Sequence, residues 1–416
     1  MVLLEQVQQQ YETLPYPHRD PARELELLRQ PSISELPRIL EVFWGGRRAV
    51  DGNFRVLDAG CGTGDNTVFL AEQLRGTGAQ IVALDFSNTS LDIARERVAL
   101  RGLSDGVRFV QSPLEAAPSL DIGTFDFIVT TGVLHHLSSP QAGLVALREV
   151  LKLDGGIGIM VYARYGREPV YAMQALMRRL APRTLPQAER LRVLRATLRT
   201  LPPTHRALRG LMEMPIFKHE IESSDAGDYD LLLHTQDRSY TVSEIDEWLS
   251  GAGMALRAFS VPRRYEPSTY QRDTRVAAMP DQERRAVAEL LHGAMPKHEF
   301  YAARSEHSEQ VVATDDVTAR PVWCSWQFGD MVAPALERPG NQLRFTFGEE
   351  RDLALGGDAI TRSLLRDIDG QRTVGDLFER ASHLSDRPSA RQVQRRWAEI
   401  ADPLRAVGAL ALHLPL

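Results

Sequence analysis

A glycine-rich loop directly after a short apolar run is the feature that most restricts the fold of this chain. The run RVLDAG contains Asp58 near its end, and Gly60, Gly62 and Gly64 follow before a helical segment begins. Glycine lets the backbone turn sharply here and approach a ligand without a Cβ clash. The G-x-G-x-G spacing differs from the G-x-G-x-x-G spacing of dinucleotide-binding folds. The loop therefore predicts a strand, a ligand-binding turn and a helix.

Short apolar runs alternate with longer helical segments through most of the first 300 residues. This alternation predicts βαβ units and a parallel sheet, which is an α/β fold. A helix is also predicted from about Pro21 to Trp44, and another over YTVSEIDEWLSGAG, which has a start signal and a glycine after its end. The predicted strands are RVLDAG, IVALDF, VRFVQS, FDFIVTT, GGIGIMVYA, MALRAFSV and KHEFYAAR.

Two carboxylates are predicted to stand at the ends of neighbouring strands. Asp58, beside the glycine loop, would repel a diphosphate and suits a ligand with a positive charge, such as the ammonium of a methionyl group. Asp85 ends the second strand, where an acid accepts hydrogen bonds from ribose hydroxyls. Ligands of such sheets bind at the carboxyl ends of the strands, so both acids and Thr131 are expected to converge.

These residues resemble the motifs of the class I S-adenosylmethionine-dependent methyltransferases. The resemblance rests on LDAGCGTG, ALDFS, and FDFIVTTGVLHHL followed by LKLDGGIGIMV. It covers residues 53–162 closely and 239–304 with less specificity. It implies a Rossmann-like seven-stranded sheet whose last strand is antiparallel, an enzyme that transfers a methyl group, and S-adenosyl-L-methionine as the cofactor.

The resemblance also implies roles for single residues. Gly60 and Gly62 would line the methionyl end of the cofactor, Asp58 would lie behind its amine, and Asp85 would hold the ribose. Ser112 stands where the family often has an aspartate that contacts the adenine amine, so the adenine would rest on backbone and apolar contacts. The other predicted cofactor-binding residues are Gly64, Leu114 and Thr131.

His136 and His135 are the predicted catalytic residues, with His136 preferred. A methyl acceptor needs a base only if it is protonated, and an imidazole titrates near neutral pH. The pair follows the fourth predicted strand directly. The alternative is that both histidines are structural. No metal ligands are predicted.

The substrate pocket is predicted from two segments. The first is YETLPYPHRDP, which contains Tyr11 and Tyr16 and is interpreted as a lid over the cofactor. The alternative interpretation is that this segment only packs the N-terminus against the rest of the protein. ARYGREPVY, after the fifth strand, places Tyr165 and Arg167 where a class I enzyme builds its acceptor pocket. A nearby segment adds His234, Asp237 and Arg238, of which the last two could instead form a structural salt bridge.

Residues 164–225 interrupt the α/β pattern and are predicted to form a helical insertion. Nine arginines and one acid lie between Arg178 and Arg209, and the acidic stretch EIESSDAGDYD follows. The favoured interpretation is charge pairing on helix surfaces. The alternative is a surface for an acidic substrate or RNA, which the lack of interleaved aromatic residues disfavours.

The segment 316–416 is predicted to be a separate winged-helix-like domain that resembles the small PqqD-like peptide-holding modules. It contains QLRFTF, three helical stretches and the closing run ALALHL. An exposed strand such as QLRFTF could pair with a peptide, and the alternative is a dimerisation or stabilising appendage. The other predicted divisions are 1–50 (helices and lid), 51–163 (cofactor-binding core), 164–225 (insertion) and 226–307 (remaining core).

Composition limits the remaining function classes. Cys61 and Cys324 are the only cysteines, which favours a reducing, cytoplasmic location, and neither a signal peptide nor a membrane span is expected. A net charge of −6 makes nucleic acid an unfavourable partner. The predicted function is methyl transfer to a peptide or protein side chain. A small-molecule (natural-product) methyltransferase and a non-catalytic cofactor-binding scaffold are the alternatives, and a homodimer is left open.

Overall fold

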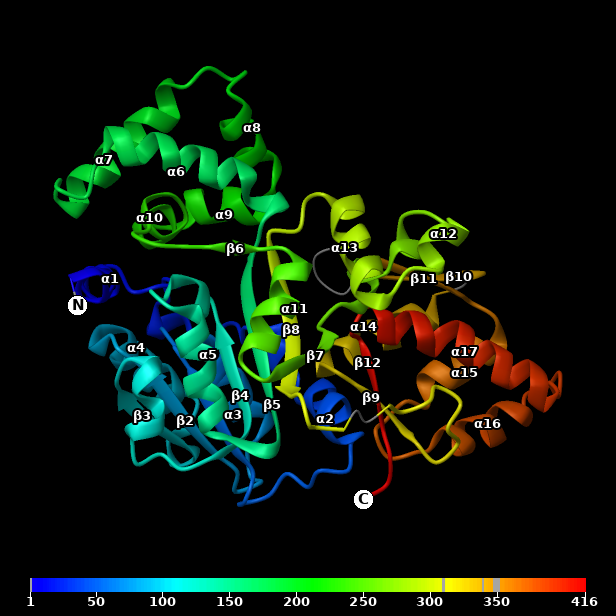
Figure 1. Ribbon diagram of the computed structural model, residues 1–416. Coiled ribbons are helices and arrows are strands. Elements are labelled where there is room, and N and C mark those ends of the chain that lie inside the picture. Colours follow the sequence, from blue (N-terminus) through cyan, green and yellow to red (C-terminus); the bar gives the residue numbers. More distant parts are fainter. Residues whose placement is uncertain (1, 309–310, 339, 347–351) are drawn as a thin grey trace.

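A mixed eight-stranded sheet forms the centre of the molecule (Figure 1). The computed structural model describes residues 2–308, 311–338, 340–346 and 352–416. The strand order is β3-β2-β1-β4-β5-β8-β7, with the short β6 paired to β5. The bounds are β1 Arg55–Ala59, β2 Gln80–Asp85, β3 Val107–Gln111, β4 Phe125–Thr131, β5 Leu151–Ala163, β6 Ser239–Tyr240, β7 Met254–Phe259 and β8 Lys297–Arg304.

The strand directions confirm the predicted α/β fold. β1 to β5 pair in parallel, whereas β8 runs antiparallel between β5 and β7. All seven predicted strands are present, and the antiparallel strand is the predicted KHEFYAAR. The two-residue strand β6 was not predicted, because it is too short to show a periodic pattern.

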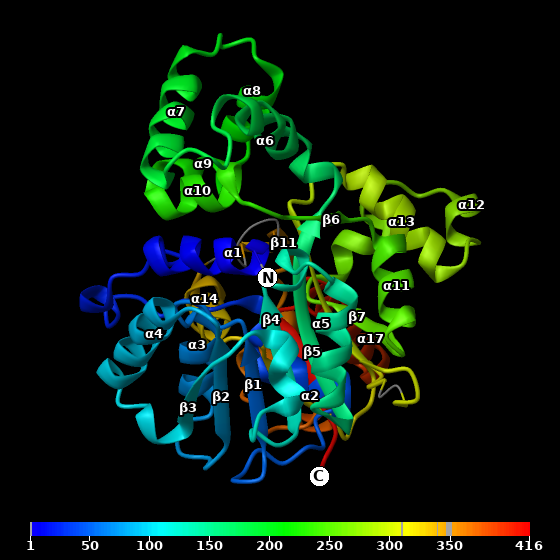
Figure 2. The same ribbon diagram turned by 60° about the vertical axis from the view of Figure 1, so that its left-hand side comes forward.

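Helices cover both faces of the sheet and bury one apolar core on each (Figure 2). α2, α3 and α4 pack on one face, and α5 and α11 pack on the other. The helices of this part are α1 Val2–Thr13, α2 Leu36–Trp44, α3 Asp65–Gln73, α4 Asn88–Leu100, α5 Pro140–Glu149, α11 Val242–Gly251, α12 Thr274–Ala277 and α13 Asp281–His292.

The helix boundaries correct one prediction and confirm another. The helix predicted from Pro21 to Trp44 is wrong over its first half: short 3₁₀ turns occupy Pro21–Arg23 and Ser32–Ser34, and the α-helix begins at Leu36. Pro31 explains the interruption, because proline removes a backbone donor and disfavours helix in the residue before it. The helix start in YTVSEIDEWLSGAG is confirmed, since Thr241 caps α11 in a reciprocal capping box with Glu244.

Five helices after β5 form a cluster with its own apolar core, and Figure 2 shows it facing α1. They are α6 Glu168–Leu180, α7 Gln187–Thr200, α8 Arg206–Glu213, α9 Pro215–Ser223 and α10 Asp225–Leu233. Arg195 of the arginine-rich stretch pairs with Asp225 and Asp228 of the acidic stretch. The favoured interpretation, charge pairing between helices, therefore holds for these residues.

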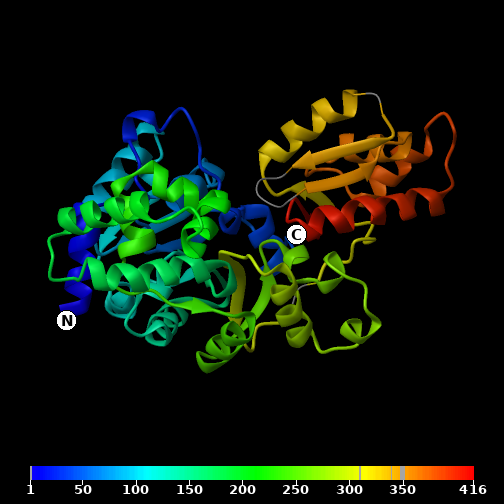
Figure 3. The same cartoon turned by 90° about the horizontal axis from the view of Figure 1, so that it is seen from above.

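The C-terminal part forms a second unit with a separate core (Figure 3). The three predicted helices and the closing strand are present, while α14 was not predicted because Gly329 and Pro334 interrupt its pattern. Phe347 of QLRFTF lies outside the described residues. The elements are β9 Arg320–Trp323, α14 Trp326–Glu337, β10 Gln342–Thr346, β11 Asp352–Gly356, α15 Ala359–Arg366, α16 Val374–Ser382, α17 Ala390–Ala406 and β12 Leu410–His413.

This unit is docked on the sheet domain through α2. Glu41 accepts the backbone N–H of Leu412 at 3.1 Å and forms an ion pair with Arg405 at 2.9 Å. His413 donates to the carbonyl of Pro37 at 2.8 Å. Within the described residues, no helix has the length and apolar character needed to cross a membrane.

Candidate active site

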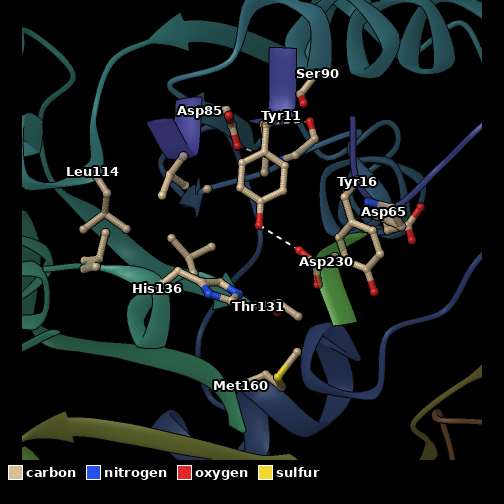
Figure 4. Close-up of a pocket in the computed structure, with 18 of the residues that line it drawn as sticks. Tyr11, Tyr16, Asp65, Asp85, Ser90, Leu114, Thr131, His136, Met160 and Asp230 are labelled. Atoms are coloured by element: carbon tan, nitrogen blue, oxygen red, sulfur yellow. Dashed lines mark hydrogen bonds between the residues drawn. The ribbon is translucent and has the colours of Figure 1, made fainter. Parts of the chain in front are cut away.

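A cavity of about 510 Å³ lies at the carboxyl ends of β1, β2 and β4. The sheet forms its floor, and α1 with α9 and α10 closes it from the other side. Figure 4 shows side chains from these elements pointing into one space. Ten of the predicted site residues line it: Tyr11, Tyr16, Gly60, Gly62, Asp85, Ser112, Leu114, Thr131, His136 and Arg167.

The glycine loop is built so that no side chain fits at its first two glycines. Gly60 and Gly62 have φ of +80° and +51°, in the left-handed region. A Cβ on Gly60 would lie 2.3 Å from a methyl of Val133, and one on Gly62 would lie 2.9 Å from the carbonyl oxygen of Tyr16. The loop therefore packs directly against neighbouring segments while its backbone faces the cavity.

Asp85 ends β2 at the edge of the cavity. Its carboxylate accepts the backbone N–H of Gly62 at 2.8 Å and that of Ser87 at 2.9 Å. Burial raises the pKa of Asp85 to about 6. The two bonds fix the carboxylate next to the glycine loop, where it can still accept hydrogen bonds from a ligand.

Asp58 ends β1 behind the loop and does not line the cavity. It is fully buried, and one of its oxygens accepts the hydroxyl of Thr67 at 2.5 Å. Its other oxygen, Oδ1, has no hydrogen-bond partner among the described residues. Burial raises the pKa of Asp58 to about 7.

The raised pKa of Asp58 predicts how stability depends on pH. Between its ordinary value of 3.8 and about 7, the folded protein binds a proton that the unfolded chain does not. The contribution of Asp58 to the free energy of unfolding should therefore rise as the pH falls below about 7, by up to roughly 1.4 kcal/mol per pH unit. Chemical denaturation of the wild type and of Asp58→Asn at several pH values measures the difference. An equal pH dependence in both proteins would contradict the prediction.

The remaining predicted cofactor residues lie in different places. Ser112 and Leu114 follow β3 and line the cavity next to Asp85, and Thr131 lines it from the end of β4. Gly64 has a φ of +94° but faces Ala94 of α4, so it shapes the loop without lining the cavity.

Residues 2–20, called here the N-terminal strap, run across the cavity. Glu12 accepts the backbone N–H groups of Asn88 and Thr89 at 2.7 and 3.1 Å, at the start of α4. Arg19 pairs with Asp65 at 2.6 Å, next to the glycine loop. The strap is thereby attached to both sides of the cavity floor.

The two strap tyrosines reach the helical cluster. The hydroxyl of Tyr11 donates to Asp230 at 2.9 Å, which Figure 4 shows as a dashed line, and that of Tyr16 donates to Glu220 at 3.0 Å. Burial raises the pKa of both tyrosines, so they remain neutral donors at physiological pH. The strap therefore closes the cavity by bonding to α9 and α10.

The two histidines of the predicted pair are placed differently. His136 lines the cavity, and its Nδ1–H donates to the carbonyl of Gln236 at 2.7 Å. The neutral ring consequently keeps a lone pair on Nε2. His135 is fully buried outside the cavity lining, and burial lowers its pKa. Of the two, only His136 can meet a ligand in the cavity.

His136, Asp230 and His234 bring potential metal-ligand atoms within 4.8 Å of one another. However, Nδ1 of His234 accepts the backbone N–H of Gln236 at 3.0 Å, so the neutral ring carries its proton on Nε2. That nitrogen contacts the hydroxyl of Tyr11 at 3.3 Å. The group is therefore a hydrogen-bond network in which His234 has no free lone pair for a metal.

Arg167 and Tyr165 follow β5, as the sequence predicted for the pocket. Arg167 is buried and lines the cavity, with its guanidinium 3.4 Å from the centre of the Tyr162 ring and 3.8 Å from Asp237. Tyr165 does not line the cavity. Asp237 pairs instead with Arg167, and Arg238 donates to the carbonyl of Ser138, so the part of the chain that the structure describes does not contain the alternative Asp237–Arg238 salt bridge.

The side chains of the cavity that the sequence analysis missed include Tyr162, Glu220 and Asp230. Glu220 and Asp230 are the first and last residues of the acidic stretch EIESSDAGDYD, which was interpreted as a surface feature. Asp230 lies five positions after Asp225, close to 1.4 helical turns, so the two point to different sides of α10. The positions of the acids around the helix are the sequence signal that could have distinguished the acid facing the cavity from the acid on the surface.

Comparison with known proteins identifies the central domain. Residues 56–155 match the profile of a family described as "Methyltransferase domain". An uncharacterized protein of Synechococcus is 30% identical over 354 residues, which are 82% of this chain and 80% of the relative. The ubiquinone/menaquinone biosynthesis C-methyltransferase UbiE of Xanthomonas oryzae is 29% identical over 163 residues, 38% of this chain and 63% of that enzyme.

Solved structures show the same fold over more of the chain. PKMT2 of Rickettsia typhi has a TM-score of 0.65 at 13% identity and covers 92% of this chain and 76% of its own. The structure of that protein in complex with AdoHcy has a TM-score of 0.64. At this identity the similarity concerns the fold.

Proposed function

Because this chain belongs to the class I S-adenosylmethionine-dependent methyltransferases, we propose that its cavity is the site where the cofactor meets a peptide or protein side chain. S-Adenosylmethionine supplies a methyl group that is already activated on a positively charged sulfur. The protein must therefore hold donor and acceptor in line and exclude water. The cavity at the carboxyl ends of the strands, with the N-terminal strap across it, is the observation that carries this proposal.

The residues present suit the cofactor. Asp58 is fully buried, and its unpartnered oxygen fits a place behind the methionyl amine, while Asp85 offers free acceptor sites for the ribose hydroxyls. Gly60 and Gly62 leave the loop backbone open toward the methionyl part. Leu114 and the adjacent backbone, rather than an acidic side chain, would contact the adenine.

His136 is proposed as the general base that deprotonates the methyl acceptor. Its Nδ1–H is held by the Gln236 carbonyl, so Nε2 can take a proton from an acceptor in the cavity. Tyr11 and Tyr16 hold the strap over the site, and this closure excludes water during the transfer. Arg167 is proposed to shape the acceptor side of the pocket.

A peptide or protein acceptor is favoured by the C-terminal unit. The hairpin β10–β11 followed by three helices supports the proposed similarity to PqqD-like winged-helix modules. Among the described residues, β10 and β11 pair only with each other, and the outer edge of such a hairpin can pair with a peptide. A small natural product is the second candidate, which a cavity of about 510 Å³ also suits. Cys61 and Cys324 form no disulfide among the described residues, and a reducing, cytoplasmic location is proposed on this basis.

Labelling of native extracts tests the proposed function and separates the two acceptor classes. Extract is incubated with the purified protein and S-adenosylmethionine that carries an isotopically labelled methyl group. Mass spectrometry should find the label on a peptide or protein when the wild type is added and not when Asp85→Ala is added. Label confined to small molecules would favour the natural-product alternative. If the added protein binds the cofactor but no component of the extract becomes labelled, the result would favour a non-catalytic scaffold.

A further inference from the structure

The acceptor side of the cavity contains two carboxylates that lack a cationic partner. Asp230 on α10 is 3% exposed and accepts the hydroxyls of Tyr11 at 2.9 Å and Tyr162 at 3.3 Å. Glu220, in the second turn of α9, accepts the hydroxyl of Tyr16 at 3.0 Å. These donors are neutral. Among the described residues, neither carboxylate has a lysine, arginine or histidine within ion-pair distance.

The basic side chains that line the cavity have carboxylates of their own. Arg167 lies against the Tyr162 ring, and its nearest carboxylate is that of Asp237 at 3.8 Å. Arg19 pairs with Asp65 at 2.6 Å, and Lys297 pairs with Glu299 at 3.0 Å. Within ion-pair distance, Asp230 and Glu220 are therefore surplus carboxylates on this side of the cavity, and the charges of Arg167 and Arg19 act on them only from farther away.

A surplus of buried negative charge is unfavourable until a cation pairs with it. Burial raises the pKa of both Asp230 and Glu220, in agreement with this cost. The rings of Tyr11 and Tyr16 stand beside the two carboxylates, and aromatic rings attract cations through their faces. Carboxylates and aromatic rings together are suited to an ammonium group.

We propose that the methyl acceptor is the nitrogen of an aliphatic amine, which enters the cavity as an ammonium ion and is bound by Asp230 and Glu220. The inference rests on the proposed function, because it assumes that this cavity is the site of methyl transfer. It defines the acceptor class within that function: an alcohol or a carboxylic acid would not neutralise the two carboxylates.

An ammonium group must lose a proton before its nitrogen can accept a methyl group, and His136 is placed to accept that proton. A ring nitrogen of His136 and a carboxylate oxygen of Asp230 lie within 4.8 Å of each other, so a base stands beside the proposed ammonium site. The acceptor nitrogen gives one proton to His136 and uses the freed electron pair to bond to the methyl carbon. The carbon–sulfur bond breaks, and its electron pair stays on the sulfur of S-adenosylhomocysteine. The positive charge of the sulfonium thus ends on the methylated nitrogen, next to Asp230.

Binding of a small amine tests this assignment without turnover. Calorimetry measures the affinity of the wild type, saturated with S-adenosylhomocysteine, for n-butylamine and for butan-1-ol, which has the same size but no charge. We expect butylamine to bind at least tenfold more tightly than butanol. Asp230→Asn keeps the shape of the side chain and removes its charge, and should lower butylamine affinity at least tenfold while changing S-adenosylhomocysteine affinity less than twofold.

Two matched controls remove a carboxylate from the same helices outside the cavity. Asp225→Asn on α10 and Glu222→Gln on α9 change side chains that are 54% and 60% exposed, and should leave both affinities unchanged. Glu220→Gln provides a second cavity variant if Asp230→Asn fails to fold. Equal binding of butylamine and butanol, or no effect of either cavity variant, would overturn the proposal.

Two further measurements test alternatives to the amine site. The first asks whether Asp230 binds the cofactor, and the second asks whether the product is a methyl ester. A loss of S-adenosylhomocysteine affinity in Asp230→Asn, with butylamine affinity retained, would assign Asp230 to the cofactor and overturn the amine site. Label transferred by the wild type should survive strong base, as an N-methyl group does. Label released as methanol would identify a methyl ester, which refutes the amine acceptor while leaving methyl transfer itself intact. A protein that binds no S-adenosylhomocysteine would instead refute the proposed function.

Discussion

Replacing His136 by alanine should slow methyl transfer at saturating cofactor by roughly 10²–10⁴-fold, the usual contribution of a general base. The variant removes the Nε2 lone pair that faces the cavity. Single-turnover measurements with the identified acceptor determine the rate of the chemical step. Affinity for S-adenosylhomocysteine should stay within a few fold of the wild type, because the ring lies on the acceptor side.

His136→Asn separates proton transfer from positioning. Its side-chain amide can still donate to the Gln236 carbonyl, but it cannot accept a proton as imidazole does. If His136 is the base, the asparagine variant should be as slow as the alanine variant. Added imidazole should then restore part of the rate in His136→Ala. Near wild-type turnover in His136→Asn would make His136 a positioning residue.

Replacing Asp85 by alanine should lower the affinity for S-adenosylmethionine at least tenfold. The variant removes two potential hydrogen bonds to a charged acceptor, and each contributes about 1.5–3 kcal/mol. It also frees the N–H of Gly62, which Asp85 now holds at 2.8 Å in the glycine loop. Isothermal titration calorimetry with S-adenosylmethionine gives the change directly.

Asp92→Ala is the matched control for this loss. Asp92 lies on α4, seven positions after Asp85, and its side chain is 72% exposed and paired with Arg95. Its removal should leave cofactor affinity unchanged. Thermal melts of both variants without cofactor show whether the fold is retained. Wild-type affinity in a folded Asp85→Ala would remove Asp85 from the proposed cofactor site.

The sequence predicted the sheet because strand and helix patterns are local. Buried parallel strands appear as short apolar runs, and the glycines with Asp85 follow them at fixed offsets. The same applies to α11, whose start is encoded by Thr241 and Glu244. The strands of the sheet, and the residues proposed here for the cofactor side of the cavity, can therefore be predicted from the sequence.

The proposed acceptor side could not be predicted in this way, because it is assembled from distant segments. Tyr11 meets Asp230 across 219 positions, and Tyr16 meets Glu220 across 204. Composition describes the stretch with Glu220 and Asp230 as acidic, but it does not tell which acids point outward. Arg195 pairs with Asp225 and Asp228, and only the tertiary structure shows that the other two lie in the cavity.

The docking of β12 on α2 has a consequence for the order of folding. Glu41 and Leu412 are separated by 371 positions, and Glu41 is 3% exposed once Arg405 and the Leu412 N–H have bonded to it. During synthesis Glu41 leaves the ribosome 364 positions before Arg405 and 371 positions before Leu412. Contacts between such distant positions form late and slow the completion of the fold. Glu41 on α2 consequently stays without these two partners until the C-terminal unit has been made and has folded onto the helix.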